Sequence, residues 1–124
     1  MLGESTVIAT VAVSDIEKAK EFYGGTLGLK QIDENPGGVA YASGTGQIFV
    51  YPSQYAATNK ATCADWEVED IKKVIQELKT KGVSFERYDF PGVEYDGDVH
   101  IMEGMKAAWF KDPDGNILGL SSPV

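Results

Sequence analysis

Residues 109–120 of this chain read WFKDPDGNILGL, in which two apolar runs flank the turn DPDGN. Apolar runs on either side of a turn rich in Asp, Pro, Gly and Asn indicate a β-hairpin. Residues 40–51, AYASGTGQIFVY, have the same outline. The chain of 124 residues therefore contains one hairpin pattern twice, which predicts that a structural unit is repeated.

The repeat extends to the segments that precede the hairpins. Residues 9–19 (ATVAVSDIEKA) align with residues 64–74 (ADWEVEDIKKV) at an offset of 55, whereas Gly46 and Gly115 in the turns align at an offset of 69. The second half therefore carries about 14 additional residues, which we place within the segment 88–105.

Each half has the same predicted order of elements: a strand, a helix and three further strands. Ser14 and Asp70 are the candidate residues that cap the two helices. We therefore predict an α+β fold of two βαβββ modules, about residues 1–55 and 60–124, within a single domain that spans 1–124. One helix covers one face of each small sheet, so the other faces stay open and can enclose a cleft.

Composition and charge exclude several classes of function. The formal net charge is -8, and no basic stripe of the kind that binds nucleic acid is present. No apolar run approaches the roughly 20 residues that span a membrane. The first apolar stretch lacks the preceding basic segment of a signal peptide. Cys63 is the only cysteine, which excludes an internal disulfide and favours a cytoplasmic location.

Together, these motifs resemble the vicinal oxygen chelate superfamily, which includes glyoxalase I, extradiol dioxygenases, and fosfomycin and bleomycin resistance proteins. The similarity lies in VSD (residues 13–15) followed by FY and LG, in VED (68–70) followed by KGV, and in the terminal FKDPDGNILGL. It covers nearly the whole chain. The resemblance implies two modules that form a half-open barrel around one ligand cleft, and it implies a homodimer.

The same resemblance points to four strand positions at which metal-dependent members of the superfamily carry their ligands. In this chain those positions are Ile8, Val50, Cys63 and Gly119. Divalent metals at such sites need imidazole or oxygen donors, and a single thiol among three apolar positions does not provide them. A register error of one residue would not restore a donor at any of the four. We therefore expect neither a metal nor another cofactor.

Alternation along the strands, together with the resemblance, predicts which residues face the cleft. The predicted ligand-binding residues are Ile8, Thr10, Val50, Tyr51, Tyr55, Cys63, Asp65, Glu67, His100, Trp109, Gly119 and Ser121. Among them, Gly119 is expected to open volume for a ligand, whereas Trp66 is expected to belong to the core. An aromatic and acidic lining suits a small hydrophobic, aromatic or cationic organic molecule. In the alternative interpretation, Asp65 and Glu67 face solvent and Trp109 only fills space.

His100, the only histidine, lies in the additional segment of the second half. Asp96, Asp98 and His100 alternate, so a strand would place them on one face. A metal site, a general base, a ligand contact and a solvated acidic loop are all compatible with this pattern. No catalytic residue can be assigned, because the sequence contains no phosphate-binding loop, dinucleotide motif or Ser-His-Asp order.

Three functions follow from these observations. The favoured one is a metal-free binding protein of the bleomycin-resistance type, which sequesters a hydrophobic, aromatic or cationic molecule. The alternative is a lyase, isomerase or dioxygenase with a non-standard metal or acid/base site around Asp65, Glu67 or His100. The third is a structural or regulatory module whose cleft is vestigial.

Overall fold

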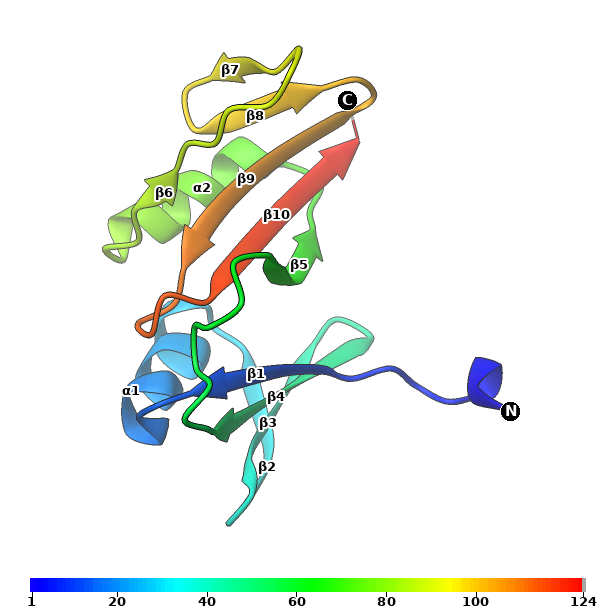
Figure 1. Ribbon diagram of the computed structural model, residues 1–124, viewed down its shortest axis with the longest axis vertical. Helices are drawn as coiled ribbons and strands as arrows, with labels where there is room; N and C mark the ends of the chain where they lie inside the picture. Colours follow the sequence, from blue (N-terminus) through cyan, green and yellow to red (C-terminus); the bar gives the residue numbers. More distant parts are fainter. Residues whose placement is uncertain (124) are drawn as a thin grey trace.

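The first module forms a four-stranded sheet with one short helix (Figure 1). The computed structural model describes residues 1–123. The elements of the module are β1 (Ala9–Val13), α1 (Ile16–Lys20), the π-helical turn η2 (Glu21–Thr26), β2 (Lys30–Asn35), β3 (Gly38–Ser43) and β4 (Gly46–Pro52). The strand order is β1-β4-β3-β2, in which β1 runs parallel to β4 and the other pairs are antiparallel.

The second module repeats this topology with a longer sheet. Its elements are β5 (Thr62–Glu67), α2 (Ile71–Thr80), β6 (Phe85–Glu86), β7 (Glu94–Asp96), β8 (Val99–Met102), β9 (Met105–Lys111) and β10 (Ile117–Pro123). The strand order is β5-β10-β9-β8-β7, and β6 pairs with another part of β9. Like β1 and β4, β5 and β10 are parallel. β8 and β9 form a hairpin, and the additional segment 88–105 contains β7 and β8.

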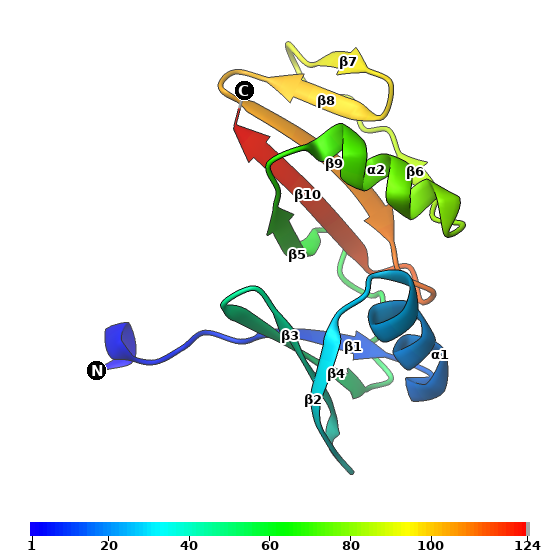
Figure 2. The ribbon, with the colours of Figure 1, turned by 180° about the vertical axis from the view of Figure 1, so that it is seen from behind.

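The two modules give two separate sheets that do not close into a barrel (Figures 1 and 2). Seen from behind, α2 lies in front of β9 and β10. The opposite face of the second sheet is turned toward the viewer in Figure 1. The predicted α+β fold of two βαβββ modules is confirmed.

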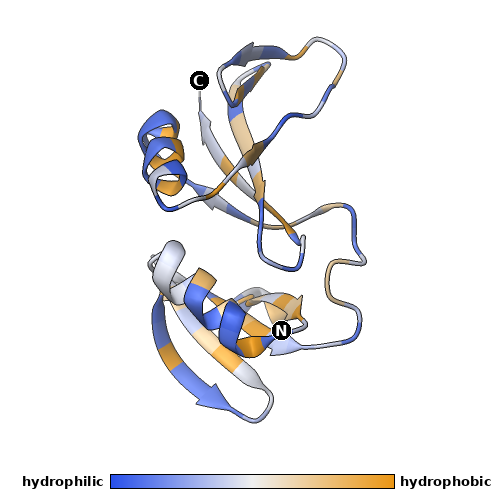
Figure 3. Ribbon diagram, turned by 90° about the vertical axis from the view of Figure 1, so that its left-hand side faces the viewer, coloured by the Kyte–Doolittle hydropathy of each residue, from blue (hydrophilic) through white to orange (hydrophobic). Residues whose placement is uncertain are grey.

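Aspartates cap both helices. Asp70 accepts a hydrogen bond from the backbone N–H of Lys73, as the sequence predicted. In the first helix, however, the cap is Asp15, which accepts from the N–H groups of Glu17 and Lys18. The prediction of Ser14 was wrong by one residue, because Asp15 has the extended backbone of a cap and its carboxylate already reaches the free N–H groups. Both helices show alternating blue and orange stripes in Figure 3, as amphipathic helices should.

A single hydrophobic cluster joins the two modules. It contains the helix-facing residues of both sheets together with the apolar faces of α1 and α2. Trp66 packs against this cluster, so its prediction as a core residue is confirmed. Its Nε1–H also donates a 2.9 Å hydrogen bond to Ser43 Oγ, across the junction between the modules.

The DPDGN turn, residues 112–116, fixes the second module to the first. Asp112 is buried and accepts a 2.8 Å hydrogen bond from the hydroxyl of Tyr23, which lies in η2. Asn116 donates from Nδ2 to the carbonyl oxygen of Ala12 at 2.7 Å, and its Oδ1 accepts from the N–H of Ala57 at 3.0 Å. Burial, and then the neighbouring Asp112, raise the pKa of Tyr23 far above its usual value, so this phenol keeps its proton and acts as the donor.

The N-terminal arm, residues 1–8, extends away from the first sheet (Figure 1). It contains the short 3-10 turn η1 (Leu2–Glu4), and it exposes the large apolar side chains of Met1, Leu2, Val7 and Ile8. None of the helices within residues 1–123 is long and apolar enough to cross a membrane.

Candidate functional site

The face of the second sheet opposite α2 carries several of the predicted site residues. The even-numbered side chains of β10 are buried beneath α2, so its odd-numbered residues face the other way. On that open face Gly119 pairs with Trp109 and Asp65, and Ser121 pairs with Glu67. The fold therefore brings residues from β5, β9 and β10 together on one surface.

Side chains from neighbouring strands fill the space above Gly119. A Cβ atom at this position would lie 2.8 Å from Asp65 Oδ1 and 3.4 Å from Trp109 Nε1. The Trp109 Nε1–H donates to Thr62 Oγ1 at 3.0 Å, and the Ser121 hydroxyl donates to Asp65 Oδ2 at 2.6 Å. Gly119 does not open volume for a ligand, contrary to the expectation. Instead, it allows a carboxylate and an indole to pack directly against the backbone.

We expect the substitution Gly119→Ala to lower the free energy of unfolding by about 1 kcal/mol, because the new methyl group displaces Asp65 from Ser121. Urea unfolding followed by circular dichroism measures this loss. Gly46→Ala is the matched control, since a Cβ atom there meets only Ser43 O at an ordinary 3.5 Å. Equal stability of the two variants would contradict the close packing over Gly119.

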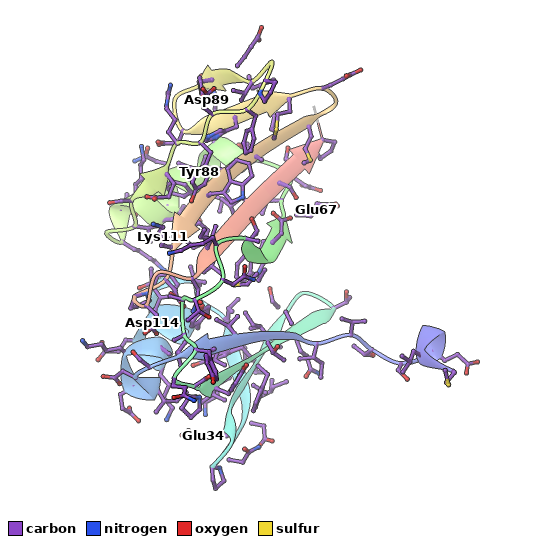
Figure 4. All side chains as sticks on the ribbon, viewed as in Figure 1. Glu34, Glu67, Tyr88, Asp89, Lys111 and Asp114 are labelled. Carbon is purple, nitrogen blue, oxygen red and sulfur yellow. The ribbon has the colours of Figure 1, made fainter. Side chains whose placement is uncertain are left out.

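A cleft of about 530 Å³ adjoins the open face where β9 and β10 meet the linker between the modules. Trp109 and Ile117 belong to the sheet and form its floor. Its other lining residues are Lys60, Ala61, Thr62, Tyr88, Asp89 and Phe90. Of the ligand-binding residues predicted from the sequence, Trp109 alone lines this cleft. In Figure 4, Tyr88 lies over β9 between Asp89 and Lys111.

Aromatic rings surround Trp109. The ring centroids of Tyr88 and Phe90 lie 5.5 Å and 5.7 Å from that of Trp109, and the Tyr88 ring meets the indole edge to face. The His100 ring meets the indole edge to face at 4.9 Å. Such pairs stabilise one another beyond the area they bury. The cleft is thus lined by a preformed aromatic cluster.

His100 supports this cluster from beneath and does not line the cleft. Its side chain is completely buried, at 0% exposure. Nε2 accepts a 2.9 Å hydrogen bond from the backbone N–H of Tyr88, so the neutral ring carries its proton on Nδ1, which lies 3.2 Å from the carbonyl oxygen of Asp98. Both nitrogens are occupied. The prediction that His100 contacts a ligand is therefore corrected: it holds Tyr88 in place.

Asp96 and Asp98 do not share a face with His100. Both lie at the turn between β7 and β8 and form ion pairs with α2, Asp96 with Lys72 and Asp98 with Lys79. The expected alternation fails because the chain reverses at Gly97, which has a φ of +62°. These carboxylates attach the hairpin to the helix. Among residues 1–123, no three His, Cys, Asp or Glu side chains are grouped so that they could hold a metal ion.

The open face of the first module carries Thr10 and Tyr51, as expected from alternation. Val50 is wholly buried, at 0% exposure, beneath α1, so its predicted place in the cleft was wrong. Phe49 occupies the open face instead and stacks on Tyr51 at 6.2 Å between ring centroids. Tyr55 projects from the linker and is 66% exposed. None of these residues lines the cleft around Trp109.

Cys63 also points away from the open face. The pairing between β5 and β10 shifts after Ile117, which is a β-bulge. The side chain of Cys63 consequently packs against the hydrophobic cluster. Burial, and then the nearby Asp112, raise the pKa of this thiol. The predicted role of Cys63 as a cleft residue is corrected, and its thiol is protonated and unreactive at neutral pH.

Tyr88, Phe90, Thr62 and Lys60 line the cleft but were not among the residues predicted from the sequence. Tyr88 and Phe90 belong to the additional segment of the second half, and that insertion was the available signal, because long insertions often cover binding sites. Thr62 was not predicted because strict alternation along β5 places Cys63 on the open face and Thr62 on the helix side. The β-bulge exchanges these two sides. Nothing in the local sequence marks Lys60.

The fold and this site define a class: a small α+β protein of two repeated modules, with an aromatic cleft on the open side of one sheet. A family model described as Glyoxalase/Bleomycin resistance protein/Dioxygenase superfamily matches residues 6–120. The chain belongs to this superfamily, as the sequence motifs indicated. No curated protein sequence matches the chain significantly.

Solved structures share the fold over nearly the full length. The glyoxalase family protein from Enterococcus faecalis is 23% identical with a TM-score of 0.74, over 98% of this chain and 99% of that one. A superfamily member from Sphaerobacter thermophilus DSM 20745 is 26% identical with a TM-score of 0.71, over 98% and 99%. TnmS3, an antibiotic binding protein from Streptomyces sp. CB03234, is 24% identical with a TM-score of 0.74, over 100% and 99%.

Proposed function

We propose that this protein binds and sequesters a small aromatic molecule, with a preference for cations, without a metal ion and without transforming the molecule. The observation that supports this most directly is the cleft around Trp109, which is lined by rings and contains one carboxylate, Asp89, and one ammonium group, Lys60. Rings and a carboxylate favour stacking and cation–π contact. At about 530 Å³, the cleft falls within the range of small-molecule sites.

Two further observations support binding rather than catalysis. The four positions at which superfamily enzymes carry metal ligands hold Ile8, Val50, Cys63 and Gly119, and both nitrogens of His100 are occupied within the protein. The same fold serves antibiotic binding in TnmS3. The single, partly buried cysteine agrees with a reducing compartment, and we propose the cytoplasm as the location.

A thermal-shift series tests the proposed binding. The probes are three planar aromatic molecules of similar size, namely the cation 9-aminoacridine, neutral anthracene and the anion anthracene-2-carboxylate, together with bleomycin. Because a ligand that binds only the folded protein raises the melting temperature, we expect the largest rise with 9-aminoacridine. The net charge of -8 also favours the cation. The absence of any shift with all four probes, each at its highest soluble concentration, would reject the proposed function.

We further propose that two copies of the chain form a homodimer in which the N-terminal arm of each copy packs on the other. The arm exposes Met1, Leu2 and Val7 at 100%, 77% and 86% respectively. Large apolar side chains grouped on a projecting segment lose contact with water only if a second surface covers them.

Sedimentation velocity tests the dimer. We expect the intact chain to sediment as a dimer at micromolar concentration, and the triple variant Leu2→Ser, Val7→Ser, Ile8→Ser to shift it toward monomer by at least tenfold in the dissociation constant. Glu4→Gln is the matched control in the same arm and should leave the dimer intact. A wild-type protein that sediments as a monomer would rule out the dimer.

A further inference from the structure

One wall of the cleft is held in place by side chains and not by a strand. Tyr88 and Phe90 lie between β6 and β7, in residues 87–93, which belong to no helix or strand. The backbone N–H of Tyr88 donates to His100 Nε2 at 2.9 Å, and its carbonyl oxygen accepts from the Tyr95 hydroxyl at 2.8 Å. Both backbone groups of Tyr88 thus bond to side chains of the β7–β8 hairpin, so the position of this wall depends on those side chains.

His100 is the member of this arrangement whose hydrogen bonding changes with protonation near neutral pH. It is the only histidine in the chain, and histidine is the side chain that typically gains a proton between about pH 8 and pH 5. In the neutral ring Nε2 is an acceptor, because Nδ1 carries the proton. A second proton on the ring turns Nε2 into a donor that faces the N–H of Tyr88. Two donors cannot bond, so protonation breaks the hydrogen bond that positions Tyr88.

The closed cluster offers a protonated ring neither water nor a counter-charge. The side chain of His100 is 0% exposed, and no ion pair of His100 is found within residues 1–123. The nearest carboxylates along the chain, Asp96 and Asp98, are paired with Lys72 and Lys79 of α2. A buried charge without a partner destabilises the arrangement that encloses it.

The elements packed against His100 add no negative charge to the ring. Tyr95 of β7 and Trp109 of β9 meet the imidazole edge to face, at 5.2 Å and 4.9 Å between centroids. On the wall itself, the Arg87 guanidinium lies over the Tyr95 ring, 3.8 Å from its centroid, which places a positive charge on this side of the cluster. Asp89 lines the cleft without pairing with His100. A proton on His100 is therefore accommodated only if the wall moves and admits water.

We propose that His100 is a positioning residue that makes ligand binding in the cleft depend on pH, an inference that rests on the proposed function. With a neutral ring, His100 holds Tyr88 against Trp109 and the cleft binds its aromatic ligand. With a protonated ring, the bond to Tyr88 is lost, the wall moves away from Trp109 and the ligand is released. Affinity is therefore full where His100 is neutral, and it falls as the pH is lowered through the titration of the ring.

Nuclear magnetic resonance of the free, untagged protein tests the switch without a ligand. Because the chain has one histidine, the carbon-bound ring protons give a single set of signals that reports the protonation of His100. We expect these signals to move between about pH 8 and pH 5, and the backbone amide signal of Tyr88 to move with the same midpoint. Ring signals that stay in place over this range, or a Tyr88 amide that does not follow them, overturn the proposal.

Titration with 9-aminoacridine, which is a cation throughout this range, measures the effect on binding. We expect wild-type protein to bind it about 5- to 10-fold more weakly at pH 5 than at pH 8, the size of effect that the loss of one buried hydrogen bond produces. In His100→Gln the side-chain oxygen can accept from Tyr88 but does not titrate, so the ratio of the two affinities should fall to about one. Asp89→Asn is the matched control: it removes the carboxylate of the cleft, and its ratio should stay that of the wild type.

These outcomes separate the switch from the proposed function. If wild-type protein binds the probe equally well at both pH values, or if His100→Gln keeps the wild-type ratio, the role of His100 is wrong while the binding function stands. If Asp89→Asn abolishes the ratio, the cleft carboxylate is the titrating group and the proposal is likewise overturned. If the ring and the Tyr88 amide titrate together but the probe binds at neither pH, the binding function fails for this ligand, whereas the opening of the wall is established. Melting temperatures of both variants show whether each is folded, and the resonance titration of the wild type decides the case should His100→Gln not fold.

Discussion

Replacing Asp112 with alanine is expected to lower the free energy of unfolding by about 3–4 kcal/mol, the largest effect of any single substitution considered for this chain. Its Oδ2 accepts from the Tyr23 hydroxyl and from Asn116 Nδ2, both at 2.8 Å. Its Oδ1 accepts from the backbone N–H groups of Asp114 and Asn116 at 3.0 Å and 2.8 Å. Alanine leaves four donors without an acceptor at a junction where Asp112 is buried.

Urea unfolding monitored by far-ultraviolet circular dichroism measures this loss. Asp114→Ala is the matched control two residues away, since this carboxylate is half-buried and bonds only to Ser14; we expect a loss of about 1 kcal/mol or less. Equal midpoints for the two variants would contradict this account of the DPDGN turn.

Replacing Trp109 with alanine is expected to weaken the binding of 9-aminoacridine by about 30-fold or more, which corresponds to ~2 kcal/mol. Trp109 is part of the floor of the cleft and the ring on which Tyr88, Phe90 and His100 all pack. Its removal takes away the stacking surface and also loosens the walls. Titration with fluorescence detection of the acridine measures the affinity.

Trp109→Phe is the matched variant, because it keeps an aromatic floor and loses only the donor to Thr62. We expect its affinity to fall by no more than about 5-fold. The melting temperatures of both variants without ligand show whether the fold is intact. Unchanged affinity in Trp109→Ala, with the fold preserved, would place the binding site elsewhere.

The fold could be predicted from the sequence because the features that determine it are local and repeated. Asp70 precedes an apolar stripe of helical spacing, and DPDGN lies between two apolar runs. Each of these patterns spans only a few residues, so the local sequence is sufficient to predict the helix and the hairpin. The error at the first helix has the same origin, because Ser14 and Asp15 are adjacent and both residue types cap helices.

The site was harder to predict, since it depends on the register of the strands and on segments distant in the sequence that pack over the sheet. The β3–β4 turn has two residues, Gly44 and Thr45, between paired Ser43 and Gly46, whereas the β9–β10 turn runs from Asp112 to Asn116. The alignment of Gly46 with Gly115 therefore displaced the positions assigned in β4 by one residue. A shift of one residue moves a side chain to the other face of a sheet, which is why Val50 was assigned to the cleft in place of Phe49.

The burial of His100 has no local signal at all. A histidine that alternates with aspartates in an acidic segment is usually solvated. Here the rings of Tyr88, Phe90 and Tyr95 pack around the His100 ring. Their centroids lie 6.4, 6.4 and 5.2 Å, respectively, from that of His100. Contacts of this kind arise only after the chain has folded, so a pattern along the sequence does not reveal them.

The hairpin of β7 and β8, with the segment that leads into it, exists in only one of the two repeats. The first module has the shorter form of the repeated unit, whereas the additional segment of the second module contributes Tyr88, Asp89 and Phe90 to the lining of the cleft. Under the proposed function, substitutions at residues 88–90 would change the lining of the cleft while the junction formed by Asp112 and Tyr23 stays as it is. A library of variants at residues 88–90 is therefore the first choice for changing which molecule the protein binds.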